Sequence, residues 1–313
     1  MLWKVLEFPK MILHWWGPLL DNPTVLGRLE NIEENLLTRN KVTLVVNSCD
    51  ANKDVLQFFF SALDEYWAKR DFNTVVNTET EYNKLNKTIL SKLDTNDVWG
   101  LRFLRILEEV KTEYVIVVYD DYILESLLDT SLVNNIIGFM DSRINCSVFY
   151  LNAVCINDHE DDPYSEYRLL KDKVEYRLNS APAIWRKRDL VHYVFEKDNP
   201  WSLEVFGSYR TFGNGKDFYS RSSVKNNIFD YAYKKGGAVY RGRWVSDVVI
   251  PKNNKYKLDI DLNVRGMSDS LTFEKRSFKW KIKFLYLGYN MVGYKLLWFL
   301  FFSIKRKLNN YFG

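Results

Sequence analysis

Short runs of apolar residues alternate with longer amphipathic stretches in the first half of the chain. The apolar run Val42 to Val46 ends in the polar segment NSCDAN, and FNTVVNTET is a second short run that also leads into polar residues. The stretch between them, KDVLQFFFSALDEYWAKR, places its apolar residues at helical spacing. This pattern predicts a strand, a helix and a second strand.

The alternation continues with a second helix and a third strand. NDVWGLRFLRILEEVK has a helical apolar face, and Asp97 stands at the position of an N-cap. The run Tyr114 to Tyr119 has no polar residue in alternation, which is typical of a central strand covered on both faces. Strands and helices in this order indicate parallel crossover units, so we predict an α/β fold with an open, Rossmann-like sheet flanked by helices.

The second half of the chain is less regular. CSVFYLNAV, residues 146–154, predicts a further strand. EYRLNSAPAIWRKRDLVHYVF predicts a strand that passes through Pro182 into a helix.

A possible proton acceptor, Glu204, lies in the segment KDNPWSLEVFGSYRTFG, three residues after Trp201. A carboxylate beside a tryptophan is suited to binding a sugar and taking a proton from its hydroxyl, and apolar neighbours would raise its pKa. The alternative is an ordinary helix start, with Asp198 or Asn199 as the cap and Glu204 exposed. The pattern alone leaves both interpretations open.

The C-terminal segment is apolar and aromatic, and all of its charges are basic. Phe284 to Phe302 is a run of nineteen residues, close to the roughly 20 needed to span a bilayer, but Asn290 and Lys295 interrupt it. From Lys275 onward there are nine Lys or Arg and no acidic residue. The alternatives are a spanning helix, a helix packed on the protein body, and an amphipathic helix lying in the membrane interface.

We expect the interfacial arrangement for this segment. In it, aromatic and aliphatic groups of residues 276–313 dip into lipid while Lys and Arg meet the anionic headgroups of the inner leaflet. The N-terminal stretch with Trp3, Trp15 and Trp16 is a further candidate for the same surface. The expected location is therefore the cytoplasmic face of the cell membrane, as a peripheral protein.

Composition and charge narrow the functional classes. The chain has 313 residues, 47% of them hydrophobic and 27% charged, which is ordinary for a folded protein. Its net charge of +4 does not point to nucleic acid, because the basic residues concentrate in an apolar tail rather than along a polar groove. An odd count of three cysteines and the lack of a signal-peptide pattern at the N-terminus favour the cytoplasm.

Two adjacent aspartates, Asp120 and Asp121, follow the third predicted strand directly. Open α/β sheets bind ligands beyond the carboxyl ends of their strands, where NSCDAN, NTET and DDY would gather. None of these segments is a GxGxxG or Walker-type loop, so a dinucleotide site and a P-loop are disfavoured. A diphosphate would then be held through a divalent cation on the carboxylates. The alternative is that the aspartates cap the following helix, YILESLLDT.

Four segments, taken in order, resemble a family. KVTLVVNSCDANKDVLQFFFSALDEYW, DVWGLRFLRILEEVKTEYVIVVYDDYIL, RLNSAPAIWRKRDL and NPWSLEVFGSYR look like bacterial GT-A-fold glycosyltransferases of surface polysaccharide (capsule or O-antigen) synthesis. The resemblance covers roughly residues 40 to 250. It implies a GT-A-like open mixed sheet, a nucleotide-diphosphate sugar as donor, and a divalent metal, Mn²⁺ or Mg²⁺. YDDY stands in place of the family's DxD motif, so Asp120 and Asp121 would bind metal and donor.

The resemblance also implies roles for other residues, each at its matching position. The donor-binding set, in the loop after the first strand and near the helix before the DD strand, is Asn47, Ser48, Asp50, Asn52, Asp97 and Arg102. The acceptor-binding set is Trp185, Trp201 and Arg210. Glu204 occupies the place where inverting members carry their general base. The implied reaction is a single in-line displacement at the anomeric carbon, with inversion.

The implied partners are a nucleotide-diphosphate sugar, UDP-sugar foremost, and a glycan or lipid-linked acceptor. We expect an N-terminal aromatic, helical extension (1–40), a GT-A domain (41–255) and a basic aromatic tail (256–313). Within the domain, 41–125 would hold the nucleotide-sugar and 126–255 the acceptor. Two alternatives are a non-catalytic scaffold or sugar-binding protein, and a sugar-phosphate nucleotidyltransferase, although NSCDAN lacks the glycine- and arginine-rich loop which the latter usually needs.

Overall fold

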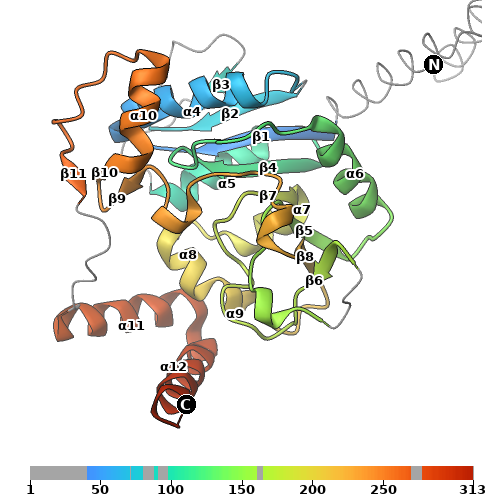
Figure 1. The fold of residues 1–313 in the computed structure, drawn as a ribbon. Helices are drawn as coiled ribbons and strands as arrows, with labels where there is room; N and C mark the ends of the chain where they lie inside the picture. The colour runs from blue at the N-terminus through green and yellow to red at the C-terminus, as the bar shows by residue number, and fades with distance from the viewer. Residues whose placement is uncertain are drawn as a thin grey trace, which may run out of the picture.

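The computed structural model describes residues 41–70, 72–79, 88–90, 98–160, 165–268 and 277–312 (Figure 1). The predicted N-terminal extension, 1–40, and the predicted donor-binding Asp97 lie outside these residues. Element labels follow Figure 1.

A mixed sheet forms the centre of the molecule. Eight strands of the described residues join it in the order β3-β2-β1-β4-β7-β5-β8-β6. They are β1 (Val42–Asn47), β2 (Asn73–Asn77), β3 (Thr88–Leu90), β4 (Tyr114–Tyr119), β5 (Cys146–Tyr150), β6 (Tyr167–Leu169), β7 (Ala183–Arg186) and β8 (Asp217–Arg221). The strands from β3 to β4 are parallel, whereas β7 is antiparallel to both of its neighbours. The prediction of an open, mixed α/β sheet is confirmed.

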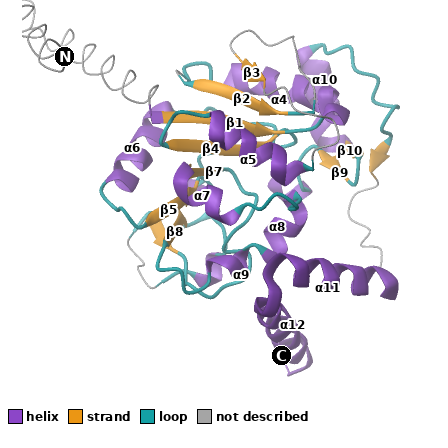
Figure 2. Ribbon diagram, turned by 180° about the vertical axis from the view of Figure 1, so that it is seen from behind, coloured by secondary structure: helices purple, strands orange, loops and turns teal. Residues whose placement is uncertain are grey.

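Helices cover both faces of this sheet. The longer ones are α4 (Lys53–Tyr66), α5 (Trp99–Glu109), α6 (Thr130–Asp141), α10 (Ser246–Tyr256), α11 (Phe278–Val292) and α12 (Leu296–Phe312). The shorter ones are α7 (Lys187–Tyr193), α8 (Pro200–Phe206), α9 (Ser208–Thr211) and the 3-10 turns η1 (Asp50–Asn52), η2 (Ile156–Asp158), η3 (Val224–Asn226), η4 (Tyr233–Lys235) and η5 (Gly293–Lys295). Figure 2 shows α5 and α7 in front of the strands.

Alternate side chains of the central strand β4 enter two separate cores. Ile116 and Val118 pack with α4, α6 and α10 on one face, while Val115 and Val117 pack with α5 and α7 on the other. This explains why the sequence of β4 is apolar throughout, because a strand covered on both faces has no solvent side. The predicted extended segment before Pro182 is instead irregular, and the chain becomes a strand only at Ala183.

A second, small sheet lies beside α10. It consists of β9 (Val239–Tyr240), β10 (Arg243–Val245) and β11 (Met267–Ser268), with β10 in the middle. Trp244 of β10 is fully buried and meets Phe58 of α4 edge-on, with ring centroids 5.5 Å apart. This contact packs β10 of the small sheet against α4.

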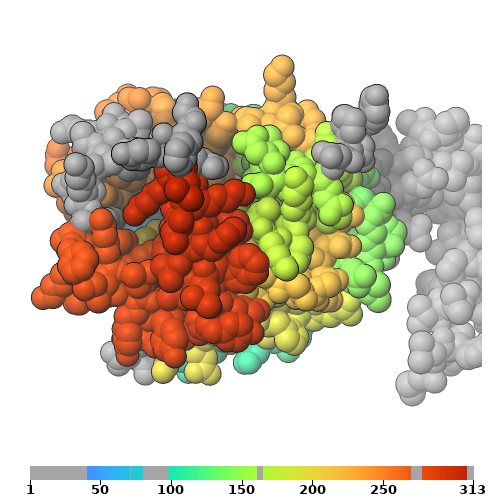
Figure 3. Space-filling view, turned by 90° about the horizontal axis from the view of Figure 1, so that it is seen from below, coloured from blue at the N-terminus to red at the C-terminus, as the bar shows by residue number. Residues whose placement is uncertain are grey.

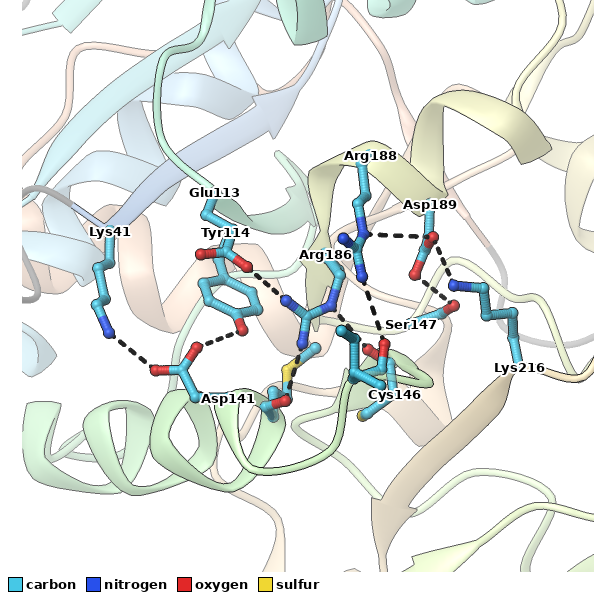
Figure 4. Close-up of polar contacts among 12 residues, drawn as sticks. Lys41, Glu113, Tyr114, Asp141, Cys146, Ser147, Arg186, Arg188, Asp189 and Lys216 are labelled. Atoms are coloured by element: carbon cyan, nitrogen blue, oxygen red, sulfur yellow. Dashed lines mark hydrogen bonds and ion pairs between the residues drawn. The ribbon is translucent and has the colours of Figure 1, made fainter.

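A polar network closes the amino end of β4 (Figure 4). Arg186 at the end of β7 forms an ion pair with Glu113 and donates to the carbonyl oxygen of Met140 at 2.8 Å. Asp141 accepts from the hydroxyl of Tyr114 at 2.7 Å and from Lys41 at 2.8 Å. These contacts tie β4, β7 and α6 together at the amino end of β4.

The two C-terminal helices form a separate layer below the body (Figures 1 and 3). They pack on α8 and α9 around a small third core that contains Phe206, Tyr209, Phe212 and Met291. Among the described residues, one helical stretch, Phe278–Leu308, is long and apolar enough to cross a membrane by length and composition. The predicted C-terminal amphipathic helical segment is therefore present.

Candidate functional site

The carboxyl ends of β1 and β4 meet at one edge of the sheet. The two strands are parallel and pair Asn47 with Tyr119, so the residues that follow them, Ser48 and Asp120, become neighbours. The amide of Asp120 donates to the carbonyl oxygen of Asn47 at 3.1 Å. The strand register thus places the first aspartate beside the loop after the first strand.

Asp120 is held by two side chains of that loop. The Oγ of Ser48 donates to Oδ2 of Asp120 at 2.5 Å, and Nδ2 of Asn52 approaches Oδ1 at 3.4 Å. The side chain is buried, and burial raises the pKa of Asp120 although these two hydrogen bonds act to lower it. The structure therefore brings together three residues of the sequence-predicted donor site.

Asp121 lies beside a glycine of the segment before β9. The amide of Ala238 donates to the carbonyl oxygen of Asp121 at 2.9 Å. Gly237 has a φ of +89°, and a Cβ there would stand 2.8 Å from Oδ2 of Asp121. Among the described residues no side-chain donor bonds to the carboxylate of Asp121, and burial, followed by the neighbouring charge of Asp120, raises its pKa.

The helix-cap interpretation of the two aspartates is wrong. After Asp121 the chain makes a single bridge, from Leu124 to Tyr231, and the next helix, α6, begins only at Thr130. Its cap is Asp129, whose carboxylate accepts from the amide of Ser131 at 2.9 Å. Asp120 and Asp121 are left at the strand end as two adjacent carboxylates without a helix to cap.

Sequence reasoning missed Arg265, a cation close to this pair. Arg265 forms an ion pair with Asp54 and donates to Oδ1 of Asn52 at 3.0 Å. Its charge acts to lower the pKa of Asp120. The arginine comes from the turn before β11, more than 200 positions after Asn52. No local pattern in the sequence marks it, because only the packing of the small sheet against α4 brings it here.

The predicted donor residues Asn47, Asp50 and Arg102 form a second wall. Oδ1 of Asn47 accepts from Nδ2 of Asn77 at 2.8 Å, while its own Nδ2 is buried without a partner in the described structure. Arg102 is ion-paired with Glu79 at 2.5 Å, and Glu79 also accepts from the amide of Asp50 at 2.6 Å. Asn47 and Arg102 are buried beneath the loop after β1. Asp50 is only partly buried and lies nearer the surface.

Glu204 lies on α8, whose start is capped by Asn199. The amide of Ser202 donates to Oδ1 of Asn199 at 2.9 Å, so Asn199 is the cap, as one of the two sequence alternatives had it. Glu204 is not exposed, however: it is half-buried, and burial raises its pKa while a hydrogen bond with Ser180 acts to lower it. A carboxyl with a raised pKa is suited to taking a proton near neutral pH.

Three tyrosines are influenced by the charges of both Glu204 and Asp121. The pKa values of Tyr119, Tyr122 and Tyr231 are raised, first by burial and further by the charges of both Glu204 and Asp121. The rings of Tyr122 and Tyr231 stack with centroids 4.4 Å apart. The charges of Glu204 and Asp121 therefore act on the same cluster of tyrosines, Tyr119, Tyr122 and Tyr231.

Two predicted acceptor-binding residues do not line this site. Trp185 is in the middle of β7, paired with Val115 and Val148, and only 3% of its surface is exposed. Because it belongs to the core under α7, it does not offer a face to a sugar. Arg210 is held by a double hydrogen bond with Asp198, at 2.5 and 2.8 Å. It also donates to the carbonyl oxygen of Tyr193 at 2.7 Å, so its role is structural.

Trp201, the third predicted acceptor residue, contacts the C-terminal layer instead. Its ring lies 4.7 Å from that of Phe284 and 5.5 Å from that of Trp280, both on α11. The side chain is still 46% exposed. Trp201 thus marks the junction between α8, the helix that carries Glu204, and α11.

A cation at this edge would have to draw on the ligand as well as on the protein. Within the described residues, no group of three or more His, Cys, Asp or Glu side chains is arranged to hold a metal. Asp120 and Asp121 offer two carboxylates with raised pKa values and incomplete hydrogen bonding. This donor set fits Mg²⁺ or Mn²⁺ bound through one or two carboxylates, phosphate oxygens and water, and does not fit an all-protein site.

Comparisons with known proteins give only distant likenesses. No family model matches the chain, and no curated protein matches it in sequence. S. aureus TarS 1-349 in complex with UDP-GlcNAc is 15% identical over 58% of this chain and 56% of that chain, with a TM-score of 0.39. A second structure of S. aureus TarS is 14% identical over 72% of this chain and 41% of that chain, with a TM-score of 0.41.

A cytidylyltransferase gives a likeness at the same level. The 2-C-methyl-D-erythritol 4-phosphate cytidylyltransferase of Thermus thermophilus is 11% identical over 68% of this chain and 98% of that chain, with a TM-score of 0.39. The chain spans less than two thirds of either TarS structure. Similarities at these scores do not select an activity, so the function has to be argued from the site itself.

Proposed function

We propose that this protein transfers a sugar from a nucleotide-diphosphate sugar to an acceptor hydroxyl. One observation carries the proposal. Asp120 and Asp121 stand as adjacent carboxylates of raised pKa at the carboxyl edge of the sheet, and they share a tyrosine cluster with Glu204, a half-buried carboxyl whose pKa is also raised. The first pair suits the leaving diphosphate and the third carboxyl suits the incoming hydroxyl.

At the donor end, Asp120 and Asp121 would act through their negative charge. When bound, a divalent cation on Asp120 and Asp121 would neutralise the diphosphate and the negative charge that develops as it leaves. Ser48 and Asn52 orient Asp120 for this task through their hydrogen bonds. The loop that carries Asp50, fixed by the ion pair of Arg102 with Glu79, is the nearest wall for the nucleoside.

At the acceptor end, Glu204 would act by accepting a proton. In a single displacement, the acceptor oxygen forms a bond to the anomeric carbon while the bond from that carbon to the β-phosphate oxygen breaks. Glu204 takes the proton of the acceptor hydroxyl, and the configuration at the carbon inverts. Half-burial keeps the pKa of Glu204 above that of an ordinary glutamate, which makes it a stronger base for this step.

The finer assignment follows the resemblance described above. We propose UDP-sugar as the donor, a glycan or lipid-linked saccharide as the acceptor, and surface polysaccharide synthesis as the process. A sugar-phosphate nucleotidyltransferase is the competing enzyme, and a non-catalytic sugar-binding protein is the competing binder. The nucleotidyltransferase would release pyrophosphate from a nucleoside triphosphate, whereas a glycosyltransferase releases a nucleoside diphosphate from its donor.

A thermal-shift screen separates these three. Nucleoside diphosphates, nucleotide sugars and CTP are each added with Mn²⁺ or with EDTA, because a ligand that binds only the folded state raises the melting temperature by mass action. We expect UDP and a UDP-sugar to raise it with Mn²⁺ and not with EDTA. A shift with CTP alone would support the nucleotidyltransferase, and no shift with any nucleotide would overturn both enzyme assignments. A rise in melting temperature with UDP-sugar, without any sugar transfer, would support the non-catalytic sugar-binding protein.

A further inference from the structure

The helices α11 and α12 each have two apolar faces, and only one of them is used for packing. The inward face contacts α8 and α9 through Phe284, Leu287, Met291, Leu296, Trp298, Phe299 and Phe302. The backbone comes very close here, since a Cβ on Gly288 would lie 2.5 Å from the ring of Phe206. This inward face uses seven apolar side chains of the two helices for packing.

The outward face is a continuous stripe at helical spacing, and nothing in the described structure covers it. The outward stripe consists of Phe278, Ile282, Tyr286 and Tyr289 on α11, Tyr294 in η5, and Leu297, Leu300, Phe301, Ile304 and Leu308 on α12. Tyr286 is 68% exposed and Leu297 is 66% exposed. In Figure 3, α11 and α12 form one unbroken surface on the lower face of the molecule. An exposed apolar surface of this extent marks an interaction site.

Charge decides which partner fits. Residues 277–312 contain seven Lys or Arg and no Asp or Glu. A hollow of about 560 Å³ between α12 and the body is lined by Lys171 and Lys173 and also by Asp158 and Glu175, so the body adds no net charge there and the positive excess comes from the two helices. A second copy of the chain would bring a stripe with the same excess of positive charge, which opposes self-association. An anionic bilayer surface matches both the apolar stripe and the cations around it.

The shape favours lying on the bilayer over crossing it. Gly293, with φ 55° and ψ −132°, breaks the helix between α11 and α12, and Lys295 follows directly. The inward face of α11 is already packed against α8, so the segment cannot leave the body as one straight helix without exposing Phe206 and Met291. A bent, one-sided apolar surface beside a folded domain is the arrangement of an interfacial helix pair.

We propose that the outward stripe of α11 and α12 docks in the interface of an anionic bilayer, and that it holds α8, the helix of Glu204, one helix layer above the lipid. The second part rests on the proposed function. Phe284 of α11 contacts both Trp201 and Phe206 of α8, with ring centroids 4.7 and 4.6 Å apart. The acceptor that reaches Glu204 is then a saccharide carried on a lipid in the same membrane.

Vesicle co-sedimentation of the full chain tests the docking. The probes are vesicles of phosphatidylcholine alone and of phosphatidylcholine with phosphatidylglycerol, at low and high salt. We expect binding to the anionic vesicles and weaker binding at high salt. The triple variant Leu297→Ser, Phe301→Ser, Ile304→Ser removes three residues of the outward stripe and should lower the partition coefficient by about tenfold or more. Replacing Lys279, Lys281 and Lys283 with Gln should lower it for anionic vesicles only.

A matched control uses exposed apolar residues elsewhere. The double variant Leu127→Ser, Ile144→Ser changes side chains that are 81% and 69% exposed and far from α11 and α12 in the sequence, and it should bind vesicles as the unmodified chain does. Unchanged vesicle binding by the triple variant would overturn the proposal. So would a dimer in sedimentation equilibrium that the triple variant converts to a monomer, or resistance to alkaline extraction from cell membranes, which indicates a spanning helix.

Membrane docking and the proposed function can be contradicted independently of each other. The UDP-dependent thermal shift with Mn²⁺ should be the same in the triple variant and the unmodified chain, because the outward stripe does not touch the strand ends. Failure of the unmodified chain to bind anionic vesicles, with its UDP-dependent shift intact, would contradict membrane docking only. Vesicle binding without any nucleotide shift would contradict the proposed function and leave the docking in place. Equal turnover on a lipid-linked and a water-soluble acceptor would overturn the lipid-carried acceptor.

Discussion

Ser48 donates a 2.5 Å hydrogen bond to Asp120, although 72 positions separate them in the sequence. The bond exists because β1 and β4 are neighbouring parallel strands in register, so both residues leave the sheet at the same edge. It is made by a hydroxyl to a buried carboxylate and therefore belongs to the stronger class of hydrogen bonds. Ser48 therefore positions the carboxylate of Asp120.

Replacing Ser48 with Ala should weaken cation-dependent nucleotide binding. Without the hydroxyl, the pKa of Asp120 rises further, because burial remains while a hydrogen bond that lowers it is lost. A carboxyl that is more often protonated binds Mn²⁺ less well, and we expect a loss of about tenfold, the effect of one pKa unit. Titration calorimetry with Mn²⁺ at a fixed concentration of UDP measures it.

Ser61→Ala is the matched control for that experiment. The hydroxyl of Ser61 donates to the carbonyl oxygen of Gln57 within exposed α4 surface, and it touches no carboxylate. The control should bind Mn²⁺ and UDP as the unmodified chain does. Equal affinities in the Ser48 and Ser61 variants would show that Ser48 does not position Asp120.

Replacing Asp121 with Asn should stabilise the metal-free protein and abolish its response to metal. The carboxylate is partly buried beside the like charge of Asp120, so neutralising it removes a repulsion, and we expect a gain on the order of 1 kcal/mol. The melting temperature in EDTA measures this. Adding Mn²⁺ and UDP should then raise it in the unmodified chain only. Asp259→Asn, at an exposed position, should change neither quantity.

Glu204→Gln should remove turnover while leaving donor binding intact. A general base contributes roughly 10² to 10⁴ in rate, and Gln keeps the size of the side chain without the basicity. The rate of UDP release with acceptor present, and the thermal shift by UDP with Mn²⁺, measure the two effects. Glu196→Gln, an exposed glutamate shortly before α8, should leave both unchanged. Turnover at the normal rate in the Glu204 variant would remove it as the base.

The pH profile of the unmodified enzyme should reflect the same group. Glu204 must be deprotonated to accept a proton, and burial raises its pKa above the ordinary value of 4.5. Activity should therefore fall as the pH is lowered, with a midpoint above 4.5, and should be fully present at higher pH. A midpoint at or below the ordinary glutamate value would contradict a half-buried base. The profile is best taken as kcat/KM, which reports groups of the free enzyme.

The sequence predicted those parts of the site that depend on strand order. An apolar run such as Tyr114 to Tyr119 has to be covered on both faces, and adjacent parallel strands end at the same edge, so Ser48, Asn52 and Asp120 were expected together. Alternation also limits side-chain direction: Trp185 stands inside a strand, and its face points into the core under α7. Motif similarity had assigned it to the acceptor, but a pleated strand buries alternate residues.

The parts that the sequence did not predict depend on contacts between distant segments. Arg265 reaches Asn52 and Asp54 only because the small sheet packs on α4. Arg210 carries a charge that suits a diphosphate, yet Asp198, twelve positions earlier, neutralises it inside the α8–α9 region. Neither pairing has a periodic signal, since each arises from how the chain returns to the sheet.

Gly237 supplies the last prediction, because its neighbour Gly236 provides an internal control. Both have positive φ, +76° for Gly236 and +89° for Gly237, so alanine at either position costs about 1 to 2 kcal/mol of backbone strain. The surroundings differ. A Cβ on Gly236 meets nothing within 4 Å, whereas one on Gly237 would lie 2.8 Å from Oδ2 of Asp121.

Gly236→Ala should therefore lower stability by the strain alone and keep the Mn²⁺-dependent binding of UDP. Gly237→Ala should lower stability further and also weaken that binding, because Asp121 has to move away from the new methyl group. Chemical denaturation measures the first effect and titration calorimetry the second. If both variants lost stability equally and bound UDP equally well, the close approach of Gly237 to Asp121 would have no part in holding the carboxylate. A loss of UDP binding in the Gly237 variant alone would show that the close packing of Gly237 against Asp121 is needed for donor binding.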